Sequence, residues 1–274
     1  MSATVHELTS QPTLWRHAAA LEPDPALPAH GLRLAVVGCG TSLYIAQAYA
    51  RSREEAGQGE TDAFAASEFP PARAYDAVLA LSRSGTTTEV LVALERLRPG
   101  TPTVALTALA DSPLAEAAGA TVVLAFADER SVVQTRFATT ALVYLRAHLG
   151  IDPATAADAA EAVLTDPLPV DPTGFDRFHF LGSGWSVGLA AEAALKLREA
   201  GRAWTEAYPA MEYRHGPIAT ADPRTLVVAF DPLDAGPEPL ATLVLCQRLA
   251  VDLAVARGFD PDTPRNLTRS VVLS

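Results

Sequence analysis

One ten-residue segment, LSRSGTTTEV at positions 81–90, gathers groups that bind anions. Five hydroxyl side chains surround a central glycine, with an apolar stretch before the segment and an amphipathic stretch after it. This pattern predicts the junction of a strand and a helix, where free backbone N–H groups and the helix dipole favour anions. The hydroxyls of Ser82, Ser84 and Thr87 would add donors without adding charge. Simple N-capping would need one hydroxyl rather than five, so we interpret the segment as a phosphate cradle. It is not a Walker loop, because it lacks Gly-Lys-Ser/Thr.

A second set of reactive side chains lies on one predicted helix. Glu192, Lys196 and Glu199 fall at i, i+4 and i+7, on one stripe, and Lys196 is the only lysine among 21 lysines and arginines. On a solvated helix, Glu192 and Lys196 would form a plain surface ion pair. The helix opens with GLAAEAAL, which indicates burial, and buried charges line a cavity or pair with each other. A carboxylate beside a lone ammonium suits proton abstraction next to a carbonyl.

Two similar segments position these groups. Residues 32–52 and 178–199 each combine a short apolar strand, Gly-x-Gly, a Ser or Thr and an apolar-periodic helix. Gly-x-Gly after a strand could be half of a dinucleotide-binding motif. Neither copy has the Gly-x-Gly-x-x-Gly spacing, and no clear acidic residue follows to hold a ribose. A dinucleotide site is therefore only a minor alternative.

Strand and helix patterns alternate along the chain, which predicts right-handed βαβ units and parallel sheets. The expected fold class is α/β, with two tandem flavodoxin-like αβα sandwiches, each built on a mainly parallel sheet. Expected strands cover 32–38, 75–82, 101–108 and 121–126 in the first copy, and 177–183 and 225–231 in the second. The predicted divisions are an N-terminal helical segment (1–29), a first domain (30–150), a linker (151–173), a second domain (174–260) and a C-terminal tail (261–274).

Composition limits the partners and the location. The chain has 274 residues, 49% hydrophobic and 19% charged, which is a globular composition. Its net charge of -11 argues against nucleic acid or anionic lipid as a partner, and an anionic ligand would need a locally positive site. Two cysteines give no disulfide framework, and we expect no metal or cofactor. We see no signal peptide, and Arg248 and Asp252 interrupt the most apolar helix, so a soluble cytoplasmic protein is expected.

Five motifs in this order resemble the sugar isomerase (SIS) family: VVGCGTS, LSRSGTTTEV, ERSVVQTRFATT, ALKLREAGRAWTEAYPAMEYRHGPIA and PRNLTRSV. The chain most resembles the isomerase half of the glutamine–fructose-6-phosphate amidotransferases, the glucosamine-6-phosphate synthases. This resemblance covers nearly the whole chain, and it implies two tandem SIS domains and phosphosugar binding. It is less specific for the reaction.

The resemblance also implies ligand contacts for individual residues. Phosphate and nearby sugar hydroxyls would be held by Ser42, Ser82, Ser84 and Thr87. Val132 and Gln134 would line the sugar, and the C-terminal tail would close over the site.

Catalytic roles follow from the same resemblance. Glu199 would move a proton between C1 and C2 of the sugar, with Lys196 as its electrostatic partner. His215, in RHGP, would assist ring opening and would come from the neighbouring subunit, so a homodimer with shared sites is expected. Without the resemblance, His215 in a tight turn would be interpreted as structural.

Departures from the family pattern bear on the reaction. No glutaminase domain precedes the isomerase-like part, so glutamine-dependent synthesis is not expected. The tail lysine that forms a Schiff base in the family is Arg269 here, and a permanently protonated guanidinium cannot act as that amine. Lys196 is then the only side chain able to form an imine. Arg83 replaces the usual glutamine of the phosphate loop and could add a two-pronged phosphate contact.

Three functions remain open. The first is an enzyme acting at C1–C2 of a phosphosugar, either an aldose–ketose isomerase or an amino-sugar phosphate deaminase-isomerase. The second is a deglycase acting on a phosphorylated ketosamine, whose substrate brings its own nitrogen. The third is a non-catalytic phosphosugar sensor. A sensor needs only the cradle, so the retained Glu199, Lys196 and His215 favour an enzyme.

Overall fold

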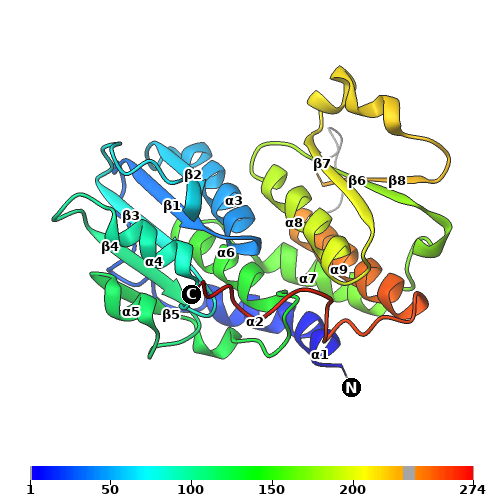
Figure 1. The fold of residues 1–274 in the computed structure, drawn as a ribbon, viewed down its shortest axis with the longest axis horizontal. Coiled ribbons are helices and arrows are strands. Elements are labelled where there is room, and N and C mark those ends of the chain that lie inside the picture. The colour runs from blue at the N-terminus through cyan, green and yellow to red at the C-terminus, as the bar shows by residue number, and fades with distance from the viewer. Residues whose placement is uncertain (1, 231–237, 274) are drawn as a thin grey trace.

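The structure, a computed structural model, describes residues 2–230 and 238–273. It contains two parallel sheets, one in each half of the chain (Figure 1). The first has five strands in the order β2-β1-β3-β4-β5, and the second has three in the order β7-β6-β8. The α/β class with parallel pairing is therefore confirmed. Asp231, the last residue of one predicted strand, lies outside the described residues.

The central strands of the first sheet are short and buried on both faces, which is why they read as continuous apolar runs, whereas the edge strands are only partly buried. Its strands are β1 (Leu34–Gly38), β2 (Thr61–Ala65), β3 (Ala77–Leu81), β4 (Thr103–Thr107) and β5 (Ala120–Val123). The helices α3 (Thr41–Glu55), α4 (Thr88–Glu95), α5 (Pro113–Ala117) and α6 (Arg136–His148) follow β1, β3, β4 and β5 in turn. One apolar cluster packs α4 and α5 against one face of this sheet, and the main core covers the other.

The second sheet is smaller and is covered by helices on its inner face. It consists of β6 (Arg177–Gly182), β7 (Trp204–Pro209) and β8 (Thr225–Ala229), with α8 (Ser186–Glu199) and α9 (Pro239–Ala256) packed beside it. The order β7-β6-β8 repeats the order β2-β1-β3 of the first sheet. Among the described residues, the second half contains no strands equivalent to β4 and β5.

The halves do not have separate cores. A single hydrophobic cluster runs from Leu34 and Leu79 of the first sheet, through the helices, to Phe178 and Phe180 of the second. Helices α3, α6, α8 and α9 lie between the two sheets (Figure 1). Among the described residues, one apolar cluster is therefore continuous across both halves.

The backbones of α3 and α8 approach each other closely where the two halves meet. A Cβ added at Gly188 of α8 would lie 2.5 Å from the carbonyl oxygen of Tyr44 and 2.8 Å from the backbone nitrogen of Ala48. Only glycine lets the two backbones come this close. This contact holds the face of α8 that carries Glu192 and Lys196 against Thr41, the first residue of α3.

The remaining helices complete the core. α1 (Ala3–Thr9) and α2 (Gln11–Ala19) precede the first sheet, and α7 (Ala154–Thr165) lies in the predicted linker. Trp15 of α2 is fully buried, and its indole N–H donates to the Thr139 hydroxyl of α6 at 3.0 Å. Of the helices in the described part, only α9 is long and apolar enough for a membrane span, yet 67% of it is buried in the protein.

Candidate functional site

A cavity of about 290 Å³ lies where the two halves meet the C-terminal tail. It opens beyond the carboxyl ends of β1 and β3, at the N-termini of α3 and α4, where α/β folds bind ligands. The size is at the lower end of small-molecule sites. Nine of the eleven candidate residues line it: Ser42, Ser82, Arg83, Ser84, Thr87, Val132, Gln134, Glu199 and Arg269.

Backbone hydrogen bonds hold the predicted cradle in shape. The Ser82 hydroxyl oxygen accepts from the Gly85 N–H at 3.2 Å, and the Ser84 oxygen accepts from the Thr86 N–H at 3.3 Å. Gly85 has a φ of 62°, and a Cβ there would lie 2.2 Å from the Ser112 hydroxyl oxygen, so no other residue fits. The loop backbone thus fixes both serine oxygens, and the Ser82 hydroxyl also lies 3.4 Å from the Thr87 hydroxyl.

Two helix N-termini add positive potential to the cavity. The N-cap residues Gly40 of α3 and Thr87 of α4 make no side-chain capping bond, so part of the first-turn N–H groups has no side-chain partner. Both ends point to the edge of the sheet where Ser42 and Thr87 line the cavity. Uncapped helix N-termini favour a bound anion. This arrangement offers an anion site in a protein whose net charge is -11.

Glu199 reaches the cavity from the other half of the protein. Its side chain is 16% exposed, and its Oε2 lies 2.5 Å from the Lys196 Nζ. Lys196 is buried behind it and also donates to the Thr41 hydroxyl at 2.9 Å. Burial lowers the pKa of Lys196, but the neighbouring carboxyl groups of Glu192 and Glu199 outweigh that effect and raise the pKa overall. Lys196 is therefore a charged partner of Glu199 and does not itself line the cavity.

Arg83 is engaged with the protein rather than with solvent. Its buried guanidinium donates to the backbone carbonyl of Ser131 at 2.9 Å and to that of Arg269 at 2.7 Å. Burial lowers the pKa of this side chain, and the buried carboxylate of Glu129 partly offsets that effect. Arg83 thus clamps the loop that carries Val132 to the C-terminal tail.

The tail crosses from the second half to the cradle (Figure 1). It begins at Asp262, whose carboxylate accepts from the N–H groups of Ala3 and Thr4, both at 2.8 Å. At its far end the Thr88 N–H donates to the Val271 carbonyl at 3.2 Å. Residues 267–271 line the cavity, so the tail forms one of its walls.

Arg269 occupies the tail position that the family resemblance assigns to a lysine. Its guanidinium donates to both carboxylate oxygens of Asp128, at 2.7 and 2.9 Å. The side chain is 42% exposed and stays at the cavity rim. It supplies positive charge there, and its guanidinium stays protonated at any relevant pH, so it cannot act as a nucleophile.

His215 is the candidate that the structure does not bring to this cavity. It ends the short 3₁₀ turn Glu212–His215, which follows β7 in the second half, and it is exposed. Figure 1 shows this segment, in yellow to orange, projecting away from both sheets. Its predicted role in a neighbouring subunit stays a prediction.

Sequence reasoning missed two residues of the site. Thr41 links Glu192 and Lys196 through its hydroxyl, and only its place after Gly-x-Gly could have signalled it. Glu129 is fully buried and accepts from the N–H groups of Thr135 and Phe137, which caps α6 behind the cavity wall. Burial raises the pKa of Glu129. A lone glutamate in DERSVVQT gives no signal of that burial.

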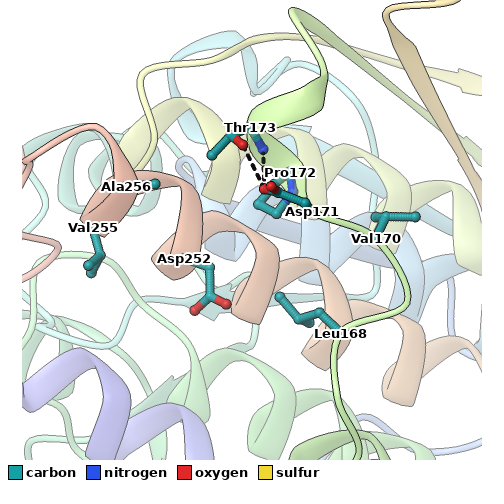
Figure 2. A pocket seen from close by; sticks show the side chains of 8 residues that line it. All are labelled: Leu168, Val170, Asp171, Pro172, Thr173, Asp252, Val255 and Ala256. Atoms are coloured by element: carbon teal, nitrogen blue, oxygen red, sulfur yellow. Dashed lines mark hydrogen bonds between the residues drawn. The ribbon is translucent and has the colours of Figure 1, made fainter.

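A second, more open hollow of about 600 Å³ lies between the linker and α9 (Figure 2). Its lining is mostly apolar, with Val255 and Leu168 on its walls and two carboxylates. One of these, Asp171, accepts from both the N–H and the hydroxyl of Thr173. No candidate residue lines this hollow, so the smaller cavity is the candidate site.

One protein family and several curated proteins are similar in sequence to this chain. Residues 29–149 match the SIS domain family. The chain is 26% identical to a glutamine–fructose-6-phosphate aminotransferase (isomerizing) of Sulfurisphaera tokodaii, over 88% of this chain and 50% of that protein. A Gloeobacter violaceus protein of the same name is 28% identical over 88% of this chain and 52% of its own length. The chain thus spans about half the length of these curated relatives.

Solved structures share the fold. The glucosamine-6-phosphate deaminase of Thermotoga maritima superposes with a TM-score of 0.82 at 24% identity, covering 99% of this chain and 100% of that one. The tagatose-6-phosphate ketose/aldose isomerase of Escherichia coli gives a TM-score of 0.78 at 22% identity, with coverages of 100% and 96%. At these identities the similarity establishes the fold.

The Arg83 clamp predicts how the tail responds to mutation. In Arg83→Gln, the tail should open more often, and trypsin should cut after Arg265 and Arg269 at least tenfold faster than in the wild type. A lost charge-assisted hydrogen bond costs about 1.5 kcal/mol or more, which corresponds to about tenfold in an opening equilibrium. Timed proteolysis with mass spectrometry measures these cuts.

Arg96→Gln, at the exposed end of α4, is the matched control. Equal cleavage rates in Arg83→Gln and wild type, with unchanged circular dichroism, would contradict the clamp.

Proposed function

We propose that this chain, which carries an SIS domain at residues 29–149, is an enzyme acting at C1–C2 of a phosphorylated sugar or amino sugar. The reaction class is that of an aldose–ketose isomerase or an amino-sugar phosphate deaminase-isomerase. One observation carries the proposal: the Glu199 carboxylate and the hydroxyl cradle line the same cavity. Phosphate bound in the cradle would place the other end of a sugar chain before Glu199.

The proposed mechanism uses groups already in place. Ser82, Ser84 and Thr87 donate to the phosphate at the N-terminus of α4, where the helix dipole favours an anion. Glu199 removes the proton from the carbon next to the carbonyl, and the electron pair passes to the carbonyl oxygen as an enediolate forms. The same carboxyl then returns the proton to the neighbouring carbon, while the hydroxyl proton on the carbon that lost its hydrogen passes to the former carbonyl oxygen, so that a new carbonyl forms there. Lys196, with its Nζ 2.5 Å from the Glu199 carboxylate, supplies a positive charge that stabilises the negative charge developing on the enediolate.

Two alternatives have specific support. A ketosamine-phosphate deglycase would fit Arg269, because a substrate that carries its own nitrogen needs no tail amine. A sensor would need the cradle alone. The buried contact between Lys196 and Glu199 exceeds that need, because an ion pair in a dry site is costly to maintain.

We also propose that residues 174–260 are a shortened second SIS repeat, supported by the matching strand order of the two sheets. In the same proposal the active unit is a cytoplasmic homodimer, and His215 completes the partner's cavity. The exposure of His215, on a segment that projects from its own half, supports a contact with another subunit. The chemistry proposed requires no metal or cofactor.

The cradle predicts selective binding of phosphorylated sugars. Fructose 6-phosphate, glucosamine 6-phosphate and tagatose 6-phosphate are the first probes, each compared with its free sugar. A bound phosphosugar at a hundredfold excess over its dissociation constant should stabilise the fold by about 2.7 kcal/mol. Differential scanning fluorimetry reads this as a rise in melting temperature, and Ser84→Ala with Thr87→Ala should abolish it. An equal rise in melting temperature with the free sugars would mean that the phosphate group does not contribute to binding.

The acid–base pair predicts a separation of binding from turnover. Glu199→Gln keeps the side-chain shape and should lower kcat by about 10²–10⁴-fold, the usual contribution of a general base. Phosphosugar binding should persist, because the cradle is untouched. Lys196→Arg keeps the charge and should retain much of the activity.

Borohydride provides the complementary measurement on the wild type. If Lys196 acts through its charge, borohydride with substrate should trap no adduct on it. A trapped adduct on Lys196, located by mass spectrometry, would contradict the electrostatic role and would move Schiff-base chemistry into α8.

The shared site predicts complementation between inactive variants. Glu199→Gln and His215→Ala homodimers should each have little activity. After subunit exchange, a mixed dimer contains one site with both wild-type residues, so up to about a quarter of wild-type activity should return when equal amounts are mixed. Exchange is verified by native mass spectrometry with one isotope-labelled variant. No recovery after verified exchange would mean that each chain builds its own site.

A further inference from the structure

Glu192 is a buried carboxyl for which the proposed reaction has no role. It lies one turn before Lys196 on α8, its side chain is 1% exposed, and it does not line the cavity. Its Oε1 lies 3.3 Å from the Lys196 Nζ and accepts from the Thr41 hydroxyl at 3.2 Å. Its Oε2 is buried and meets no hydrogen-bonding group among the described residues. A charged carboxylate normally fills both oxygens with donors.

The charges around Lys196 do not balance if both carboxyls are ionised. One ammonium lies between two carboxyl groups, and it contacts Glu199 at 2.5 Å but Glu192 at 3.3 Å. Glu199 is also partly open to the cavity, whereas Glu192 is sealed. A second negative charge in a dry site without its own cation is costly. The carboxyl that gives up its charge should be the sealed one with the longer contact.

Other elements packed on α8 supply no further cation to Glu192 among the described residues. On α3, Arg51 pairs with Glu55 and Arg53 donates to backbone carbonyls. On α9, Arg248 donates to a carbonyl of α7, and Asp252 lies in the open hollow.

The strands and α8 itself supply no cation either among the described residues. On β6 and β7, Arg177 pairs with Asp222, and His179 lies 3.3 Å from Glu206. On α8 itself, Arg198 donates to Thr205.

From this geometry we propose that Glu192 is a positioning residue that stays protonated and neutral at neutral pH, so that Lys196 gives its charge to Glu199 alone. The buried Oε2 is the oxygen that carries the proton. Burial raises the pKa of Glu192 to about 8, against the opposing charge of Lys196. The role in turnover rests on the proposed function, whereas the protonation itself can be measured without any substrate.

Deprotonation of Glu192 would change the site in a defined way. Lys196 would then be shared by two carboxylates, and a net negative charge would stand behind Glu199. An anionic phosphosugar would bind less well, and an enediolate would form less readily. Catalysis at Glu199 would therefore decline as pH rises past the point where Glu192 ionises.

Stability measurements test the protonation directly. The folded pKa of Glu192 lies above its unfolded value of about 4.5, so its protonation stabilises the fold fully below that pH and progressively less as pH rises towards about 8. Glutamine cannot ionise. The melting temperature of Glu192→Gln minus that of wild type should therefore increase as pH rises from about 4.5 to about 8, then level off. Glu95→Gln, an exposed carboxyl of α4, gives the baseline for removing one ordinary charge. A difference that follows the Glu95→Gln baseline across this range would overturn the proposal.

The pH profile of kcat/KM tests the positioning role. In wild type the profile should fall on the alkaline side near the pH at which Glu192 ionises, and in Glu192→Gln this fall should move to higher pH or vanish. A purely structural role would lower the whole profile without moving its alkaline limb. An unmoved limb together with the predicted melting curve would overturn the positioning role and leave the protonation standing. Absence of turnover in both proteins, with that melting curve intact, would instead count against the proposed function.

Discussion

The close contact of α3 with α8 is the constraint on which the rest of the site depends. Gly188 brings the two helix backbones together, so that Thr41 at the start of α3 reaches Lys196 and Glu192 of α8. The charged stripe of the second half is thereby held next to the cavity that the first half opens at β1 and β3. A larger side chain at Gly188 would push Glu199 away from the cradle. One continuous apolar core through both halves keeps this contact rigid.

The proposed cavity must bind an anion in a protein whose overall charge is strongly negative. A chain with a net charge of -11 repels anions at long range, so a phosphorylated ligand must be held by short-range groups. These short-range groups are the cradle hydroxyls, the helix N-termini and the guanidinium of Arg269 at the rim. Arg83 instead donates to the backbone of the tail. Inside, Lys196 compensates the charge of Glu199 only. Arg83, Glu199 and Arg269, which line the cavity, each have a partner within hydrogen-bond reach.

Much of this could be predicted from the sequence, because local patterns carry it. Apolar runs followed by Gly-x-Gly or by clustered hydroxyls predicted β1, β3, β6 and the cradle. The edge strands β2 and β7 were missed, since they are only partly buried and carry charges within the pattern. The shared core was missed because periodicity shows which faces are apolar and not which element covers them. The Arg83 clamp joins residues 186 positions apart, a distance over which no local pattern operates.

The most direct measurement for the whole account is proton exchange at C2 of a bound phosphosugar in deuterated water. The wild-type protein is incubated with each phosphosugar found to bind, and the C2–H resonance is followed by proton NMR. If Glu199 moves a proton at C1–C2, the resonance should disappear with the wild type and persist with Glu199→Gln, although both proteins bind the ligand. Tight phosphosugar binding by the wild type with no exchange at C2 and no product would contradict catalysis and leave a phosphosugar sensor.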